Sequence, residues 1–155
     1  MRIAVLHGPN LNLLGRREPE VYGTATLADV EGRLRRIAVE LGVEIETYQS
    51  NIEGLLVEFV QQAASMVDGF IVNAGAYTHT SVALLDALTG VGRPFVEVHL
   101  SNLSAREPFR RQSLLAPRAI GIVTGFGAES YPLALRGLVQ MLRRSVAAGV
   151  PEPTT

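Results

Sequence analysis

Short apolar runs alternate with amphipathic segments along the chain. Four of the runs have the length of β-strands, and continuous apolar runs of that length are typical of strands buried on both faces of a parallel sheet. A fifth segment, 43–49, alternates instead, with Val43, Ile45 and Thr47 on one face, as a strand does. We therefore predict strands over residues 3–6, 43–49, 69–72, 94–98 and 119–124.

Between the strands, apolar residues recur at spacings of three and four, the period of an α-helix with one buried face. Thr26 and Asp29 form a capping-box pattern before the first such segment, and Gly42 follows its end. Ser50 and Glu53 repeat the capping-box pattern before the second segment. The predicted helices cover 27–41, a segment with apolar residues from Leu55 to Met66, 80–88 and 131–147, with one more helical turn at 105–111.

This alternation predicts an α/β fold in which helices cover both faces of a parallel sheet. With five strands, the expected architecture is a flavodoxin-like three-layer sandwich with strand order 2-1-3-4-5. We expect a single domain over residues 1–149 and a frayed tail over 150–155. In such sheets, ligands bind beyond the carboxyl ends of the strands, near the reversal in strand order.

Composition narrows the possible chemistry. The chain has 155 residues, a formal net charge of −1 and no cysteine. This balance argues against nucleic acid or a charged membrane surface as a partner, and no apolar run is long enough to cross a membrane. The lack of cysteine fits a cytoplasmic protein. Lysine is also absent, which excludes a lysine Schiff base and a P-loop lysine.

Polar residues follow the predicted strands at the edge where a ligand is expected. Asn10, Asn73 and His79 follow the first and third strands, and Glu97 and His99 lie at the end of the fourth. Glu97 and His99 are two residues apart on one strand, so their side chains point to the same face. A carboxylate beside an imidazole fixes its tautomer and raises its pKa, as a general acid requires. The alternative is a histidine that only ends a strand.

Arginines in the next connection supply fixed positive charge. Ser101 precedes Arg106 and Arg110, and arginine at such a crevice suits a carboxylate ligand. A solvated basic turn is the alternative. We interpret Asp86 as a solvated residue on a helix face and His7 as a structural residue at the end of its strand.

The loop over residues 8–23 is long, since connections in compact domains usually have about four to six residues, and this length favours a functional loop. Arg16 and Arg17 lie shortly before Tyr22. A phenol has a pKa of about 10, and a nearby cation lowers it by roughly 1–3 units. We interpret the loop as a mobile lid that makes Tyr22 a base. The alternative is a surface loop with solvated arginines and a packed tyrosine.

Weaker motifs favour neither a cofactor nor a metal. Residues 125–130 resemble the start of a dinucleotide fingerprint, but Ser130 stands in place of the third glycine and no βαβ unit follows. Only Glu97 accompanies the histidines, so we expect no metal site. The competing hypothesis is a non-catalytic flavodoxin-like module that binds a nucleotide or a phosphorylated partner. Against it, the first strand ends in His7 and Gly8 rather than in an acidic cluster.

Three long segments resemble the signature segments of the type II 3-dehydroquinate dehydratase family. They are GPNLNLLGRREPEVYG at 8–23, NAGAYTHTSVALLDAL at 73–88 and EVHLSNLSAREPFRRQS at 97–113. The resemblance implies a lyase of the shikimate pathway, in aromatic amino acid biosynthesis, that reversibly dehydrates 3-dehydroquinate to 3-dehydroshikimate. It also implies that no metal or organic cofactor takes part and that the protein forms a homododecamer of trimers.

The same resemblance implies roles for individual residues. By position, Tyr22 is the base and works as a phenolate beside Arg17, while Asn10 holds a water or the enolate oxygen. His99, oriented by Glu97, protonates the departing hydroxyl. Substrate-binding roles are implied for Asn73, His79 and Arg110 at ring hydroxyls, for the backbone of Leu100 and Ser101 at the carboxylate, for Arg106 on the lid side, and for Asp86 at a neighbouring subunit's site.

Overall fold

A computed structural model describes residues 1–16 and 24–147. The predicted lid residues Arg17 and Tyr22, and the predicted tail 150–155, lie outside these ranges. Five strands form one sheet in the predicted order β2-β1-β3-β4-β5, and every neighbouring pair is parallel. The strands are β1 Arg2–His7, β2 Glu44–Gln49, β3 Gly69–Asn73, β4 Phe95–His99 and β5 Gly121–Thr124.

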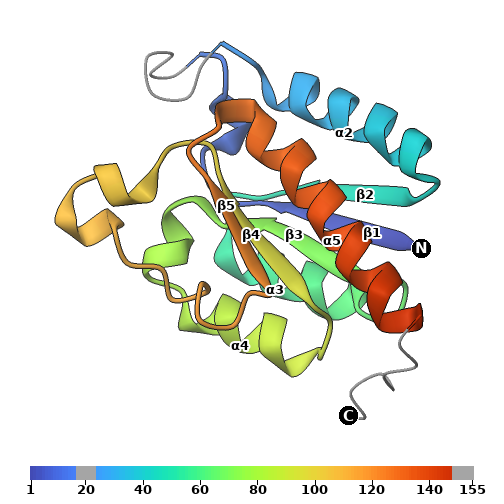
Figure 1. Cartoon of the computed structure of the whole chain (residues 1–155). Helices are drawn as coiled ribbons and strands as arrows, with labels where there is room; N and C mark the ends of the chain where they lie inside the picture. Colours follow the sequence, from blue (N-terminus) through green and yellow to red (C-terminus); the bar gives the residue numbers. More distant parts are fainter. Residues whose placement is uncertain (17–23, 148–155) are drawn as a thin grey trace.

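Helices cover both faces of this sheet, which confirms the predicted three-layer sandwich. Figure 1 shows α2 and α5 on one face and α3 and α4 on the other. The α-helices are α2 Leu27–Leu41, α3 Glu53–Ala63, α4 Val82–Gly90 and α5 Ser130–Ala147. No helix in these ranges is long and apolar enough to cross a membrane.

The central strands read as continuous apolar runs because both of their faces are buried. Ile3 and Val5 of β1 pack in the core beneath α2 and α5. Ala4 and Leu6 point the other way, into the core beneath α3 and α4. All four side chains are fully buried, and burying a large aliphatic side chain stabilises a fold by about 1.5–3 kcal/mol. The central strands are therefore held in place by packing on both of their faces.

The predicted capping box of α2 is confirmed. The Thr26 hydroxyl accepts a hydrogen bond from the Asp29 amide at 3.2 Å, and the Asp29 carboxylate accepts one from the Thr26 amide at 2.9 Å. Gly42 ends the helix in the left-handed conformation, with φ of 64°, which glycine adopts without steric cost.

The matching prediction for Ser50 and Glu53 is wrong. Helix α3 begins at Glu53 with Ile52 as its N-cap, because the Ser50 hydroxyl accepts the Ile52 amide hydrogen at 2.9 Å instead of reaching into the helix. The helix also ends at Ala63, so Met66 lies beyond it with 54% of its surface exposed. The capping pattern therefore marked a turn between β2 and α3.

Other boundaries also differ from the prediction, and β5 for example begins at Gly121 rather than at residue 119. For two helical segments the cause is clear. Helix α4 begins at Val82 rather than at residue 80, because the Ser81 hydroxyl caps it by accepting the Leu84 amide hydrogen at 2.9 Å. The turn predicted at 105–111 is two 3₁₀ turns, Leu103–Ala105 and Pro108–Arg110. Proline disfavours helical geometry in the residue before it and has no amide hydrogen to donate, so the two turns do not join.

Candidate active site

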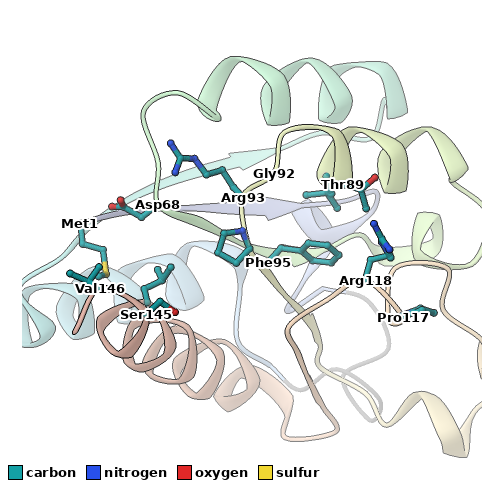
Figure 2. Close-up of a pocket in the computed structure, with 13 residues that line it drawn as sticks. Met1, Asp68, Thr89, Gly92, Arg93, Phe95, Pro117, Arg118, Ser145 and Val146 are labelled. Carbon is teal, nitrogen blue, oxygen red and sulfur yellow. The ribbon is translucent and has the colours of Figure 1, made fainter. Parts of the chain in front are cut away.

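The described chain has two cavities of note, at opposite ends of the strands. The larger one, of about 510 Å³, lies near the amino ends of β1 and β4 and is lined by Met1, Phe95, Arg118 and Val146 among others (Figure 2). Its walls contain none of the predicted site residues. Size alone therefore does not mark the chemical site.

The smaller cavity, of about 150 Å³, lies at the carboxyl ends of β1, β3 and β4, and we call it the carboxyl-edge pocket. Parallel strands end together at this edge, which is where ligands bind in doubly wound sheets. Most of the predicted site residues line it: Asn10, Asn73, His79, His99, Leu100, Ser101, Arg106 and Arg110. The structure therefore brings together residues that are up to 100 positions apart in the sequence.

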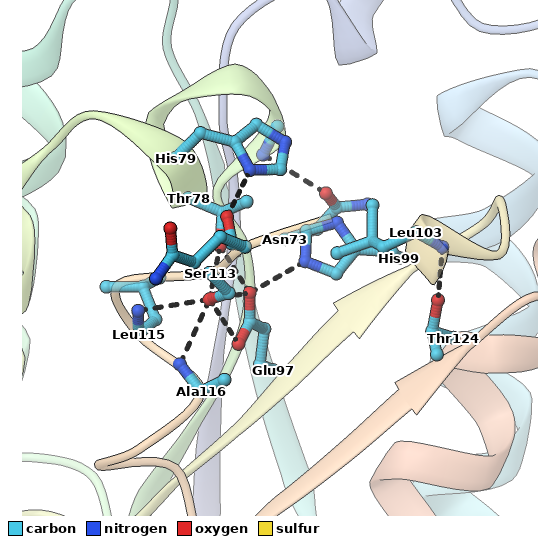
Figure 3. A network of polar contacts seen from close by, with 12 residues as sticks. Asn73, Thr78, His79, Glu97, His99, Leu103, Ser113, Leu115, Ala116 and Thr124 are labelled. Atoms are coloured by element: carbon cyan, nitrogen blue, oxygen red, sulfur yellow. Dashed lines mark hydrogen bonds and ion pairs between the residues drawn. The ribbon is translucent and has the colours of Figure 1, made fainter. Parts of the chain in front are cut away.

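Glu97 and His99 form a buried pair at the end of β4, as their spacing predicts. The His99 ring donates a hydrogen bond from Nε2 to Glu97 Oε1 at 2.7 Å (Figure 3). His99 is 5% exposed and Glu97 is fully buried. Since Nε2 is committed to the carboxylate, Nδ1 is the ring nitrogen left for a ligand, and it has no hydrogen-bond partner in the described ranges.

Two hydroxyls complete the hydrogen bonding of Glu97. Thr78 donates to Oε1, and Ser113 lies 2.8 Å and 2.9 Å from the two carboxylate oxygens. Burial tends to raise the pKa of Glu97, but the hydrogen bonds from His99, Thr78 and Ser113 outweigh it and lower the pKa from its ordinary value of 4.5. Glu97 is therefore a carboxylate at neutral pH and holds a proton on Nε2 of His99.

Sequence reasoning missed both hydroxyls. Ser113 lies in the irregular connection after β4, and it also accepts hydrogen bonds from the amides of Leu115 and Ala116, each at 3.0 Å. One side chain thus fastens that connection to Glu97. Serine in a loop has no periodicity that would single it out, although Ser113 does end the third signature segment.

We expect Ser113→Ala to destabilise the protein by about 2–3 kcal/mol, because it removes a hydrogen bond to a charged group and leaves two amides without their acceptor. Urea unfolding measures the change. Ser104→Ala is the matched control, since Ser104 is exposed on the same connection and its hydroxyl makes no hydrogen bond in the described ranges. Equal stabilities of the two variants would contradict this role of Ser113.

The remaining polar side chains of the pocket are oriented by their neighbours. His79 Nδ1 lies 2.6 Å from the Gln112 carbonyl oxygen, which can only accept, so Nδ1 carries a proton and Nε2 is left for a ligand. Arg110 donates to Glu107 at 2.8 Å, and Arg106 donates to the Ser101 hydroxyl at 3.4 Å. The pocket therefore presents imidazole and guanidinium groups together.

The first loop reaches the pocket by crossing close to the loop after β3. A Cβ atom on Gly8 would overlap the Ala74 carbonyl oxygen, so only glycine fits there. Asn10 follows in the left-handed conformation with φ of 66°, and its backbone amide donates to the Asn51 side-chain oxygen at 2.9 Å. Left-handed backbone is uncommon outside glycine, and asparagine tolerates it better than most residues.

Asn73 is held from behind the pocket by a residue that sequence reasoning missed. Its side-chain amide donates to the Tyr131 hydroxyl at 3.0 Å, and that hydroxyl lies 2.8 Å from Nδ1 of His7. The expectation that His7 is structural fits this burial, but His7 also takes part in a polar chain that leads to the pocket. Tyr131 lies in the first turn of α5, 124 residues from His7, so no local pattern could join them.

Burial lowers the pKa of His7 to about 4, from an ordinary value of 6.5. Between about pH 6.5 and pH 4, His7 therefore binds a proton in the unfolded state but not in the folded state. The free energy of unfolding is therefore unaffected by this group above about pH 6.5. It decreases by about 3 kcal/mol in all as the pH falls from there to about 4.

We expect the free energy of unfolding of His7→Asn to fall less steeply between pH 7 and pH 4.5 than that of the unchanged protein. Asparagine does not titrate, and all other groups are the same in both proteins. Urea unfolding at several pH values measures the two slopes. Parallel curves would show that His7 is not buried in its neutral form.

Asp86 lies outside the carboxyl-edge pocket. It is exposed on α4, as expected for a solvated residue on a helix face. In the described ranges, no group of three or more histidine, aspartate or glutamate side chains is placed to hold a metal ion. Among the described residues, the ionisable side chains that line the pocket are His79, His99, Arg106 and Arg110, and Glu97 is bonded to His99.

Known proteins resemble this chain along almost its full length. The family model described as Dehydroquinase class II matches residues 1–139. A 3-dehydroquinate dehydratase of Synechococcus sp. (strain WH7803) is 63% identical over 143 residues, which cover 92% of this chain and 97% of the relative. One from Gemmatimonas aurantiaca is 57% identical over 152 residues, covering 96% of this chain and 100% of the relative.

A solved structure gives the same picture. The type II dehydroquinase from Propionibacterium acnes superposes with a TM-score of 0.86 at 40% identity, over 90% of this chain and 96% of that one. The similarity therefore extends to the fold as well as to the sequence.

Proposed function

The chain belongs to the class II dehydroquinase family and is a carbon–oxygen hydro-lyase, and we propose that it dehydrates 3-dehydroquinate through an enolate, with Tyr22 as base and His99 as acid. The observation that supports this assignment of the acid is the Glu97–His99 pair at the pocket. The same proposal includes a cytoplasmic location, as the composition suggests.

The first step is removal of a proton from the carbon next to the ketone. The Tyr22 phenolate takes this proton, and the electron pair moves to the ketone oxygen to give an enolate. Arg17 favours the phenolate by its positive charge. Asn10, which lines the pocket, holds a water or the enolate oxygen, and such preorganised donors are usually the largest catalytic contribution.

The second step is loss of the hydroxyl. The enolate electrons return to form the carbon–carbon double bond, the carbon–oxygen bond breaks, and the His99 imidazolium gives its proton to the oxygen, which leaves as water. Glu97 supports this step because it holds Nε2 of His99, so that Nδ1 is the proton donor. Solvent then restores the proton on His99 and removes the one on Tyr22.

The substrate is held by the other residues of the pocket. In this proposal Asn73, His79 and Arg110 bind ring hydroxyls, and His79 offers its Nε2 because Nδ1 is bonded to Gln112. The backbone of Leu100 and Ser101 binds the carboxylate. Arg106, which lines the same pocket, takes the lid-side position in this proposal.

We extend the proposal to the assembly, a homododecamer built from trimers. Asp86 and Val82 are four residues apart on α4, so they share one helix face. Val82 has 57% of its surface exposed, and an exposed apolar residue beside a carboxylate suits a face that meets another subunit. Asp86 would then contribute to the neighbour's site rather than to its own.

The test of the function is the ultraviolet absorbance of a conjugated enone. We expect absorbance to rise when 3-dehydroquinate is added to protein treated with a metal chelator, because no step needs a metal. The matched control is Glu97→Gln, which keeps the shape of the pair but withdraws the carboxylate that holds the His99 proton. Unchanged substrate with the unaltered protein would refute the proposed function.

A further inference from the structure

A chain of three buried polar side chains runs from the core to the carboxyl-edge pocket. His7 and Tyr131 are fully buried, and Asn73 is 2% exposed. The Tyr131 hydroxyl lies between the other two, 2.8 Å from His7 Nδ1 and 3.0 Å from Asn73 Nδ2. Only Asn73 reaches the pocket, so the other two act on a ligand through it or not at all.

The direction of the hydrogen bonds in this chain is fixed. Burial raises the pKa of Tyr131 and lowers that of His7 to about 4, so the phenol keeps its proton and the imidazole is neutral at neutral pH. The Asn73 amide nitrogen can only donate to the phenol oxygen. The buried phenol proton then has Nδ1 of His7 as its acceptor among the described residues, so the phenol donates to Nδ1. His7 therefore carries its proton on Nε2, which lies 3.7 Å from Glu31 and makes no hydrogen bond in the described ranges.

The same logic fixes the orientation of the Asn73 amide. Its Oδ1 accepts the Gly75 amide hydrogen at 3.2 Å, and one hydrogen of Nδ2 is bonded to Tyr131. The second hydrogen of Nδ2 has no partner in the described ranges and belongs to a side chain that lines the pocket. A flipped amide would set a donor against the Gly75 amide and present an oxygen to the ligand instead.

We propose that Tyr131 is a positioning residue for substrate binding, which orients the Asn73 amide so that it presents a donor to a substrate hydroxyl. His7 takes part by accepting the phenol proton, which keeps the phenol oxygen available to Asn73. This proposal rests on the proposed function, because it takes the hydroxyl from 3-dehydroquinate. The contrasting role is a purely structural one, in which the polar chain only stabilises the core.

A double-mutant cycle separates these roles. Tyr131→Phe removes the acceptor for Asn73 and should raise KM about tenfold with kcat changed less than about twofold, as expected when one hydrogen bond is lost equally from substrate and transition state. In an Asn73→Ala background, the further change Tyr131→Phe should alter KM less than about twofold, because nothing is left to orient. Additive effects on KM in the double variant would overturn the proposal.

Two changes at His7 test the chain with Tyr131 intact, and they decide the matter if Tyr131→Phe does not fold. Asparagine places an oxygen near the position of Nδ1, so His7→Asn should keep KM within about threefold of the unaltered protein. His7→Leu has no acceptor for the phenol proton and should raise KM about tenfold. Equal KM values for these two variants would overturn the part assigned to His7.

The outcomes distinguish this inference from the function on which it rests. If the unaltered protein produces no enone absorbance, the proposed function fails. If it is active and the cycle is additive, only the role of Tyr131 fails. Thermal unfolding of every variant accompanies the kinetics, because a purely structural role would lower stability without coupling KM to Asn73.

Discussion

Replacing Tyr22 with phenylalanine is expected to lower kcat for 3-dehydroquinate by on the order of 10³-fold, within the usual range for loss of a general base. Only one oxygen atom is removed and the aromatic ring is kept, so the substrate should still bind. The dissociation constant for 3-dehydroquinate should therefore stay within about threefold of its original value, since the lost interaction acts only on the transferred proton. Enone absorbance gives kcat, and isothermal titration with the inactive variant gives the affinity.

Tyr48→Phe is the matched control for that experiment. Tyr48 stacks on Phe59 with ring centroids 4.6 Å apart, and its hydroxyl makes no hydrogen bond in the described ranges. The same chemical change there should leave kcat unaltered. Turnover by Tyr22→Phe comparable to that of Tyr48→Phe would remove the base from the proposed mechanism.

His99→Ala is expected to lower kcat by between about 10² and 10⁴, because the leaving hydroxyl then has no acid to protonate it. Alanine also leaves the Glu97 carboxylate without one of its donors, in a place where it is fully buried. His99→Asn is the second variant of the pair, since its amide fills more of the imidazole space but cannot supply an acidic proton.

Enone absorbance measures turnover for both variants, and circular dichroism reports whether each has folded. Both should be similarly impaired, because both lack the acid. Near-normal turnover in either folded variant would move the acid role to another group, and His79 is the other imidazole that lines the pocket.

The sheet could be predicted because its information is local. Four of the strands are short apolar runs and β2 is an alternating segment, and their alternation with helices predicts a parallel sheet. The order 2-1-3-4-5 was the expected choice for five strands. Helix boundaries were less predictable, as the two capping patterns show. Thr26 caps α2, but Ser50 is held at the end of β2 by a hydrogen bond from its amide to the His7 carbonyl oxygen at 3.1 Å. The hydrogen bonds of the sheet thus fix the position of Ser50, and α3 begins only at Glu53.

In the candidate site, too, only the contacts between residues close in the sequence were predictable. Glu97 and His99 share a strand face, so their contact follows from two-residue periodicity. Thr78, Ser113 and Tyr131 lie in three separate parts of the chain, and each contacts a partner 19, 16 or 124 residues away, respectively. These contacts depend on how loops pack over the sheet edge, and no spacing in the sequence encodes that. The roles of Tyr22 and Arg17 were predicted from the length and residues of their loop and are also implied by the resemblance to a known family. Both residues lie outside the described ranges.

The most direct test of the stepwise enolate route is hydrogen exchange by His99→Ala in deuterated water. This variant keeps the base but lacks the acid, so the enolate forms, stalls and is reprotonated by Tyr22 after that hydroxyl has exchanged with solvent. Mass spectrometry of recovered 3-dehydroquinate should show deuterium at the carbon next to the ketone, and no enzyme-dependent label once Tyr22→Phe is added. Recovered substrate without deuterium, while slow dehydration continues, would contradict the account.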